Sequence, residues 1–130
     1  MEMIRDHLGL GVAPGEFVNN LLNYYAPEFW WQFQPVHNLY LLIGAEIGVL
    51  GLVTMALLLT IIFGLGLKRA WEGRGQRMEL FLPLILAAQL VILSFFDHYF
   101  WSIQQGRWLW WMVLGMVAAM VIKEPKEGKS

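Results

Sequence analysis

The feature that most constrains this chain is an apolar run of 29 residues, from Leu39 to Leu67, in which Glu46 is the single charged residue. About 20 apolar residues in a helix are enough to cross a bilayer, so a run of this length predicts a membrane span. Pro35 lacks a backbone donor and disfavours a helical conformation at the residue before it, so the helix is expected to begin after it. The sequence therefore predicts a transmembrane helix over 39–67, with His37 at its mouth.

The rest of the composition is also typical of a membrane protein. Hydrophobic residues make up 58% of the chain and charged residues 15%, whereas about 25% charged residues is usual for soluble domains. Two further apolar segments predict spans over 79–96 and 107–122, and the spacing of apolar residues over about 16–25 predicts an amphipathic helix. We therefore expect an all-α integral membrane protein, in which three transmembrane helices follow an outer, partly helical interfacial segment over 1–38.

The distribution of charge predicts the orientation of these spans. The loop 68–78 carries four basic residues and one acidic residue, which is typical of the cytoplasmic side of a membrane. The lysine-containing tail 123–130 is expected on the same side, which places 1–38 and the loop 97–106 outside. A leading outer segment of this length without a signal sequence has little reason to be translocated alone. The sequence therefore indicates the C-terminal part of a longer protein whose N-terminal spans are missing.

Charge and residue types also exclude several classes of function. The formal net charge is −1 and no basic face is present, which excludes nucleic acid as a partner. The chain has no cysteine, which excludes disulfides and thiolate metal sites. Its three histidines, His7, His37 and His98, have no spacing that is typical of metal ligands. We therefore expect neither a metal nor a cofactor.

Three glycines follow His37 at helical spacing. On a continuous helix Gly44, Gly48 and Gly51 would lie within roughly 40° of the direction of His37. Small residues four apart allow another helix to approach closely, so these positions predict a packing face. The alternative, that the face begins near a histidine by coincidence, stays open at this point because glycine is common in membrane helices.

The residues around His37 resemble a known family. His37 and Asn38, followed after nine residues by Gly48-Val49-Leu50-Gly51, are similar to the H-[N/S/Q]-x9-G-x-x-[G/T/Y] signature of bacterial O-antigen ligases and related Wzy-type polymerases. The flanking Trp31-Gln32-Phe33-Gln34-Pro35-Val36 and the loop around Asp97 and Gly106 are similar to that family as well. The resemblance covers nearly all of this chain but only the C-terminal third or so of a family member.

The resemblance implies a function on the outer face of the bacterial cytoplasmic (inner) membrane. Such proteins transfer a glycan from an undecaprenyl-pyrophosphate carrier to a hydroxyl of a glycan, lipid A core or protein acceptor, without a metal. His37 is then the expected catalytic base, because a neutral imidazole accepts or orients a hydroxyl proton. Asn38 is expected to position the acceptor sugar and Arg107 to bind substrate. The family's pyrophosphate-binding arginines lie upstream, which implies an incomplete donor site here.

Three further residues are secondary candidates. Glu46 is expected opposite His37 on the helix and some 13 Å deeper, where it either bonds to another helix or takes a substrate or proton role. Asp97 and His98 form either an oriented base or a polar cluster at a helix end. Two other function classes stay open. One is a small transport or channel subunit with Glu46, Gln89, Asp97 and His98 along a polar path, and the other is an inactive membrane fragment.

Overall fold

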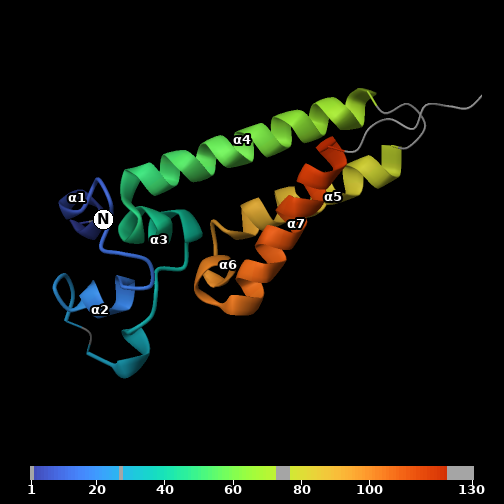
Figure 1. Ribbon diagram of the computed structural model, residues 1–130. Helices are drawn as coiled ribbons and strands as arrows, with labels where there is room; N and C mark the ends of the chain where they lie inside the picture. Colours follow the sequence, from blue (N-terminus) through green and yellow to red (C-terminus); the bar gives the residue numbers. More distant parts are fainter. Residues whose placement is uncertain (1, 27, 73–76, 123–130) are drawn as a thin grey trace, which may run out of the picture.

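The computed structural model describes residues 2–26, 28–72 and 77–122, and within these ranges the chain is helical and contains no strand (Figure 1). The structure thus confirms the all-α class. The expected tail 123–130 lies outside the described residues, as does the 73–76 part of the expected loop 68–78. Residues 68–72 of that loop belong to a helix instead.

Two helices are long and apolar enough to cross a membrane. These are α4, Gly48–Glu72, with 25 residues, and α7, Gln104–Ile122, with 19. A third helix, α5, spans Arg77–Leu93, but its apolar part runs only from 81 to 93. At 1.5 Å per residue that part is about 20 Å long, shorter than the roughly 30 Å of a hydrocarbon core. The structure therefore shows two candidate spans where the sequence predicts three.

The three long helices, α4, α5 and α7, pack against one another (Figure 1). They approach one another closely at Gly66 of α4, where an added Cβ would lie 2.7 Å from the Leu84 side chain and 2.9 Å from that of Val117. A side chain at this position would force these neighbouring side chains to move. The glycine that allows this close approach is thus outside the motif that resembles the ligase family.

The outward surface of α4 is apolar along its length. Eight large hydrophobic side chains on this helix are exposed. An apolar surface of this size on a long helix marks contact with lipid or with another protein. The exposed side chains are Val49, Leu50, Val53, Leu57, Ile61, Leu65, Leu67 and Trp71.

The predicted continuous helix over 39–67 is wrong. The structure has a short helix α3, Leu39–Glu46, that ends at Ile47, and α4 begins at Gly48 in a different direction (Figure 1). Gly48 has a φ of +74°, a left-handed backbone conformation that residues other than glycine rarely adopt. This conformation interrupts a right-handed helix. The apolar run is therefore a corner between two helices and only its second part is long enough to cross a membrane.

The N-terminal segment closes this corner with backbone hydrogen bonds. The amides of Val12 and Ala13 donate to the carbonyls of Ala45 and Glu46, at 2.9 and 3.0 Å. These are carbonyls of the last turn of α3, which have no partner within the helix. On the other side of the corner, the amide of Val49 donates to the carbonyl of Leu8 at 2.8 Å. The corner thus exists because the chain around residues 8–13 satisfies the backbone groups that it exposes.

The short elements gather at one end of the long helices (Figure 1). We call this part, residues 2–26, 28–47 and 94–103, the cap. The opposite end holds the C-terminal ends of α4 and α7 and the N-terminal end of α5. The predicted helix over 16–25 is present in shorter form as α2. The cap contains α1 (Glu2–Asp6), α2 (Phe17–Leu21), the 3₁₀ turn η1 (Trp30–Gln32), α3 and α6 (Tyr99–Ser102).

Candidate functional site

The start of α3 is bound to the end of α5. The last carbonyls of a helix have no partner within it, and three residues at the start of α3 bond to a carbonyl in the last turn of α5 and to those of the two residues that directly follow α5. The Leu39 amide donates to the Ser94 carbonyl at 2.9 Å, and the Asn38 Nδ2 donates to the Phe95 carbonyl at 2.9 Å. The Tyr40 hydroxyl donates to the carbonyl of Val91 at 2.8 Å. These bonds fix the backbone directly after His37.

Asn38 serves the fold with both ends of its amide. Its Oδ1 accepts the Leu41 amide at 2.9 Å, which makes it the N-cap of α3, while its Nδ2 is bonded to Phe95. An asparagine directly before an apolar helix is a common N-cap because its oxygen satisfies an otherwise unpaired amide. The structure therefore gives Asn38 a role in holding α3, whereas the sequence analysis expected it to bind the acceptor.

His37 and His98 lie in contact, although 60 residues separate them in the sequence. Their ring centroids are 5.2 Å apart and the ring planes make an angle of 66°, an edge-to-face arrangement. His37 is exposed, whereas the side chain of His98 is only 5% exposed. The sequence analysis named both residues separately, and the structure brings them together as one pair with one ring at the surface.

His98 is held by residues of its own segment. Its Nδ1 lies 2.6 Å from the Ser102 Oγ, one helical turn later, and its ring contacts that of Tyr99 at a centroid distance of 4.9 Å. Asp97 does not contact the ring through a hydrogen bond. Its Oδ1 accepts the backbone amides of His98 and Tyr99, at 2.6 and 3.2 Å. The structure thus favours the polar cluster at a helix end, in which Ser102 rather than Asp97 orients the imidazole.

Burial determines the charge state of His98. It lowers the pKa of His98 below its usual value, and the nearby His37 lowers this pKa further, while Asp97 acts in the opposite direction. The ring is therefore neutral near pH 7, with its Nδ1 in a hydrogen bond to the Ser102 hydroxyl, which also lies 3.2 Å from the His98 carbonyl.

This lowered pKa predicts a pH dependence of stability. The pKa of an unfolded histidine is near 6.5. Just below that pH the unfolded chain is protonated at this position, whereas folded His98, with its lowered pKa, is not. The stabilising contribution is complete above about pH 6.5 and is lost as the pH falls through the lowered pKa of His98. We expect thermal unfolding of the protein in detergent to occur at lower temperature at pH 5 than at pH 7.5.

The matched control for this prediction is His98→Phe, which keeps an aromatic ring but has no group that titrates. The fall in unfolding temperature between pH 7.5 and pH 5 should be smaller in this variant than in the wild type. An equal fall in both proteins would show that His98 does not contribute to it.

Glu46 is buried at the centre of the cap. Its side chain is 3% exposed, Oε2 accepts the Trp101 Nε1 at 2.8 Å, and Oε1 accepts the Phe17 amide at 3.4 Å. The structure thus supplies the hydrogen bond to another helix that was one of the two alternatives for this residue. Glu46 was expected within the long helix 39–67, but the corner at Gly48 leaves it in α3, beside α2 and α6 and outside the candidate span α4.

The three glycines of the sequence motif mark close contacts at the corner. A Cβ added at Gly44 would lie 2.9 Å from the Leu52 side chain, and one at Gly48 would overlap the carbonyl of Gly9. At Gly51 it would lie 2.6 Å from the Cβ of Ile47. The glycines therefore do pack closely, but against the adjoining turns and the N-terminal segment rather than on one continuous face beside His37.

Arg107 and Gln89 are not part of the histidine pair. Arg107 is exposed in the first turns of α7, and Gln89 is exposed on α5. No interaction in the described part of the chain joins either side chain to His37 or Glu46. The structure therefore does not bring Glu46, Gln89, Asp97 and His98 together into the polar path that a transport subunit would need.

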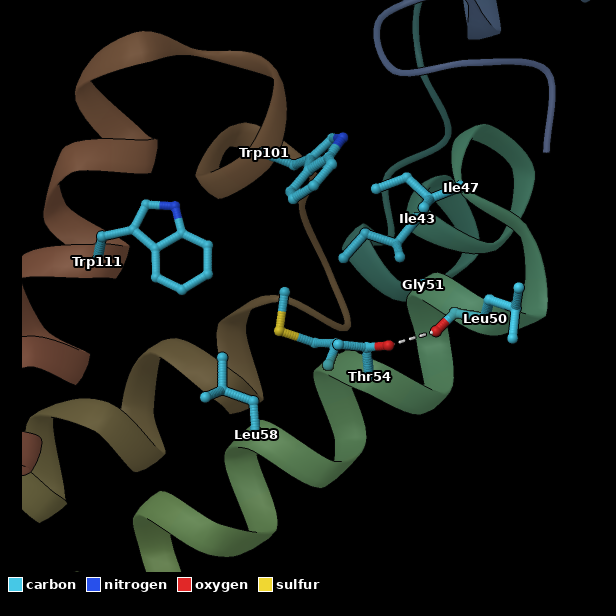
Figure 2. A pocket seen from close by; sticks show the side chains of 9 residues that line it. Ile43, Ile47, Leu50, Gly51, Thr54, Leu58, Trp101 and Trp111 are labelled. Carbon is cyan, nitrogen blue, oxygen red and sulfur yellow. Dashed lines mark hydrogen bonds between the residues drawn. The ribbon is translucent and has the colours of Figure 1, made fainter. Parts of the chain in front are cut away.

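An open apolar groove of about 320 Å³ lies between α4 and the α6–α7 segment (Figure 2). Figure 2 shows Trp101 and Trp111 on one side and the turns around Gly51 and Leu58 on the other. The hydroxyl of Thr54 in its wall donates its hydrogen to the Leu50 carbonyl at 2.8 Å, and the other side chains that line the groove are apolar or tryptophans. The groove therefore suits a hydrocarbon.

Sequence reasoning missed the two residues that organise the site from α6. Ser102 follows His98 by four residues, a spacing that places both on one helix face, and this signal could have been used. The bond from Trp101 to Glu46 joins segments that lie 55 residues apart. That pairing has no local signal in the sequence.

Within the described ranges no three carboxylate or histidine side chains come together as metal ligands. The site is therefore a pair of imidazoles, one exposed and one buried, at the end of an apolar helix bundle. Comparison of the chain with known protein families, curated proteins and solved structures finds no match.

Proposed function

We propose that this chain is the C-terminal, catalytic-histidine segment of a membrane glycan ligase or polymerase. The reaction is the transfer of an oligosaccharide from an undecaprenyl-pyrophosphate carrier to an acceptor hydroxyl in the biosynthesis of cell-surface polysaccharide. The location is the outer face of the bacterial cytoplasmic membrane, with three spans and with earlier spans of the same protein around them. The acceptor is a glycan, a lipid A core or a protein.

The exposure of His37 is the observation that carries this proposal. Asn38, Gly48 and Gly51 each have a role in the fold, as the cap of α3, the turn of the corner and a close contact. His37 is exposed and its one described interaction is the ring contact with His98. Of these motif residues, therefore, it is the one whose side chain is left for chemistry.

In the proposed reaction His37 accepts one proton. An acceptor hydroxyl attacks the anomeric carbon of the donor, the new glycosidic C–O bond forms, and the bond from that carbon to the pyrophosphate breaks. The electron pair of the broken bond leaves with the pyrophosphate, and the hydroxyl proton passes to the imidazole of His37 and then to water. The buried, neutral His98 beside it adds no positive charge that would oppose this transfer.

The apolar groove supports a donor with a hydrocarbon tail. It is lined by Trp101 on the side where α6 continues to the histidine pair, and it opens between helices whose surfaces are apolar. A prenyl tail is a hydrocarbon chain and has no group that forms hydrogen bonds. We propose that the groove holds part of this tail while the pyrophosphate lies nearer the cap.

The test of this function is product formation by the complete protein in nanodiscs. The donor is an undecaprenyl-pyrophosphate-linked oligosaccharide, the acceptor is a lipid A core, and a chelator such as EDTA is present. We expect glycan transfer at the same rate with and without the chelator. A requirement for added divalent metal, or no transfer to this acceptor or to a growing polysaccharide, would contradict the proposal.

The orientation in the membrane is tested by labelling single cysteines, since the natural chain has none. Gln105 is exposed at the start of α7 and Trp71 is exposed at the end of α4. An impermeant thiol reagent applied to intact cells depleted of their outer membrane should label Gln105→Cys but label Trp71→Cys only after permeabilisation. The reverse pattern would place His37 on the cytoplasmic side, away from the lipid-linked glycan.

A further inference from the structure

His37 is held from two directions. On the backbone side, the residues that follow it are bonded to α5, with the Asn38 Nδ2 on the Phe95 carbonyl and the Leu39 amide on that of Ser94. On the side-chain side, its ring meets the ring of His98 edge to face at 5.2 Å. An exposed side chain usually samples several rotamers, so the second contact decides how many orientations the His37 ring has.

The ring of His98 is a fixed surface. It is buried, its Nδ1 is bonded to the Ser102 Oγ at 2.6 Å, and the ring of Tyr99 packs against it. The backbone amide of His98 is bonded in turn to Asp97 at 2.6 Å. A ring restrained in this way does not change its own orientation when the exposed ring of His37 moves.

We propose that His98 is a positioning residue for His37, because its fixed ring holds the imidazole of His37 edge to face in one orientation toward solvent. This inference rests on the proposed function, because a fixed orientation of the His37 ring matters only if that ring accepts a proton. A proton acceptor is effective only within a narrow range of distance and direction to the hydroxyl. Among the groups that face His98, Asp97 is bonded to backbone amides and the Tyr99 ring lies on its own helix, so His37 is the group left for it to orient.

The test measures the order of the His37 ring directly. The 130-residue chain carries His7→Gln, so that with ¹³C,¹⁵N-labelled histidine only the two rings of the pair report. It is placed in lipid nanodiscs without donor or acceptor, and ring dynamics and ring-to-ring contacts are measured by NMR. In the wild-type pair we expect one His37 rotamer and a cross-peak between the two rings.

Two substitutions separate positioning from folding. His98→Ala removes the surface, and we expect the His37 ring to average over several rotamers. His98→Phe keeps an aromatic ring in the same place, and we expect the single rotamer to be retained, with a cross-peak from His37 to the introduced phenylalanine. The phenylalanine variant thus covers the case in which the alanine variant fails to fold.

A His37 ring that stays equally ordered in His98→Ala, or that becomes disordered in a folded His98→Phe, would overturn the positioning role. This readout needs no transfer reaction, so it is independent of the proposed function. If the ring follows the expected pattern while the complete protein transfers no glycan, the function is wrong and the positioning stands. If transfer depends on His37 while the order of the His37 ring is the same in wild type and His98→Ala, only the positioning role is wrong.

Discussion

Replacing His37 with alanine in the complete protein is expected to lower glycan transfer by about 10²–10⁴-fold, the usual contribution of a general base. The side chain is exposed and makes no hydrogen bond in the described structure, so its loss leaves the bonds that hold α3 in place. We therefore expect normal amounts of inserted protein with little product. The measurement is the rate of product formation at equal amounts of wild-type and variant protein.

His7→Ala is the matched control. His7 is also an exposed histidine of the cap, and it belongs to the turn after α1, where its backbone is hydrogen-bonded to Met3 and to Gly11. This variant should transfer glycan at close to the wild-type rate. His98 cannot serve as a control, because its ring contacts His37. Equal loss of transfer in His7→Ala and His37→Ala would contradict a catalytic role that belongs to His37 in particular.

The second large effect is expected at Gly48. Gly48→Leu forces a side chain onto a residue with φ of +74° and places its Cβ against the Gly9 carbonyl. The left-handed conformation alone costs about 1–2 kcal/mol, and the overlap must be relieved by moving the backbone of residues 8–13, which cap the corner. We expect much less inserted protein and a clearly lower unfolding temperature in detergent.

Val49→Leu is the control for Gly48→Leu because it adds bulk one residue further along the chain. The Val49 side chain is 42% exposed, and its hydrogen bond to Leu8 uses the backbone only. This variant should insert and unfold almost as the wild type does. If the two variants behaved alike, the corner between α3 and α4 would not depend on the backbone conformation of Gly48.

Local patterns in the sequence were sufficient for the all-helical class and for the place of His37 before a helix. The apolar runs predict helices because their length and composition are local properties, and two of them are long and apolar enough to cross a membrane. The last predicted span, over 107–122, lies within α7. Likewise Asn38 before an apolar run is a readable N-cap, and it places His37 just outside the helix.

The corner at Gly48 could not be predicted in the same way. A glycine in an apolar run is compatible with a continuous membrane helix, and the conformation of Gly48 is stabilised by Leu8, Gly9 and Val12, which lie about 40 residues earlier. The same holds for the pair of His37 and His98, which exists because the end of α5 binds the start of α3. Contacts between distant segments leave no periodic signal, so they were absent from the sequence analysis.

The most direct test of the central claim, that His37 accepts the acceptor proton, is chemical rescue of His37→Ala by free imidazole. The variant leaves space at an exposed position, so imidazole from solution can take the place of the missing ring. Single-turnover transfer by the complete protein in nanodiscs is measured at increasing imidazole concentration, with wild type in parallel. The account predicts that the rate of His37→Ala rises with the concentration of neutral imidazole while the wild-type rate stays constant. Wild-type activity in His37→Ala without imidazole, or a low rate that imidazole leaves unchanged, would contradict it.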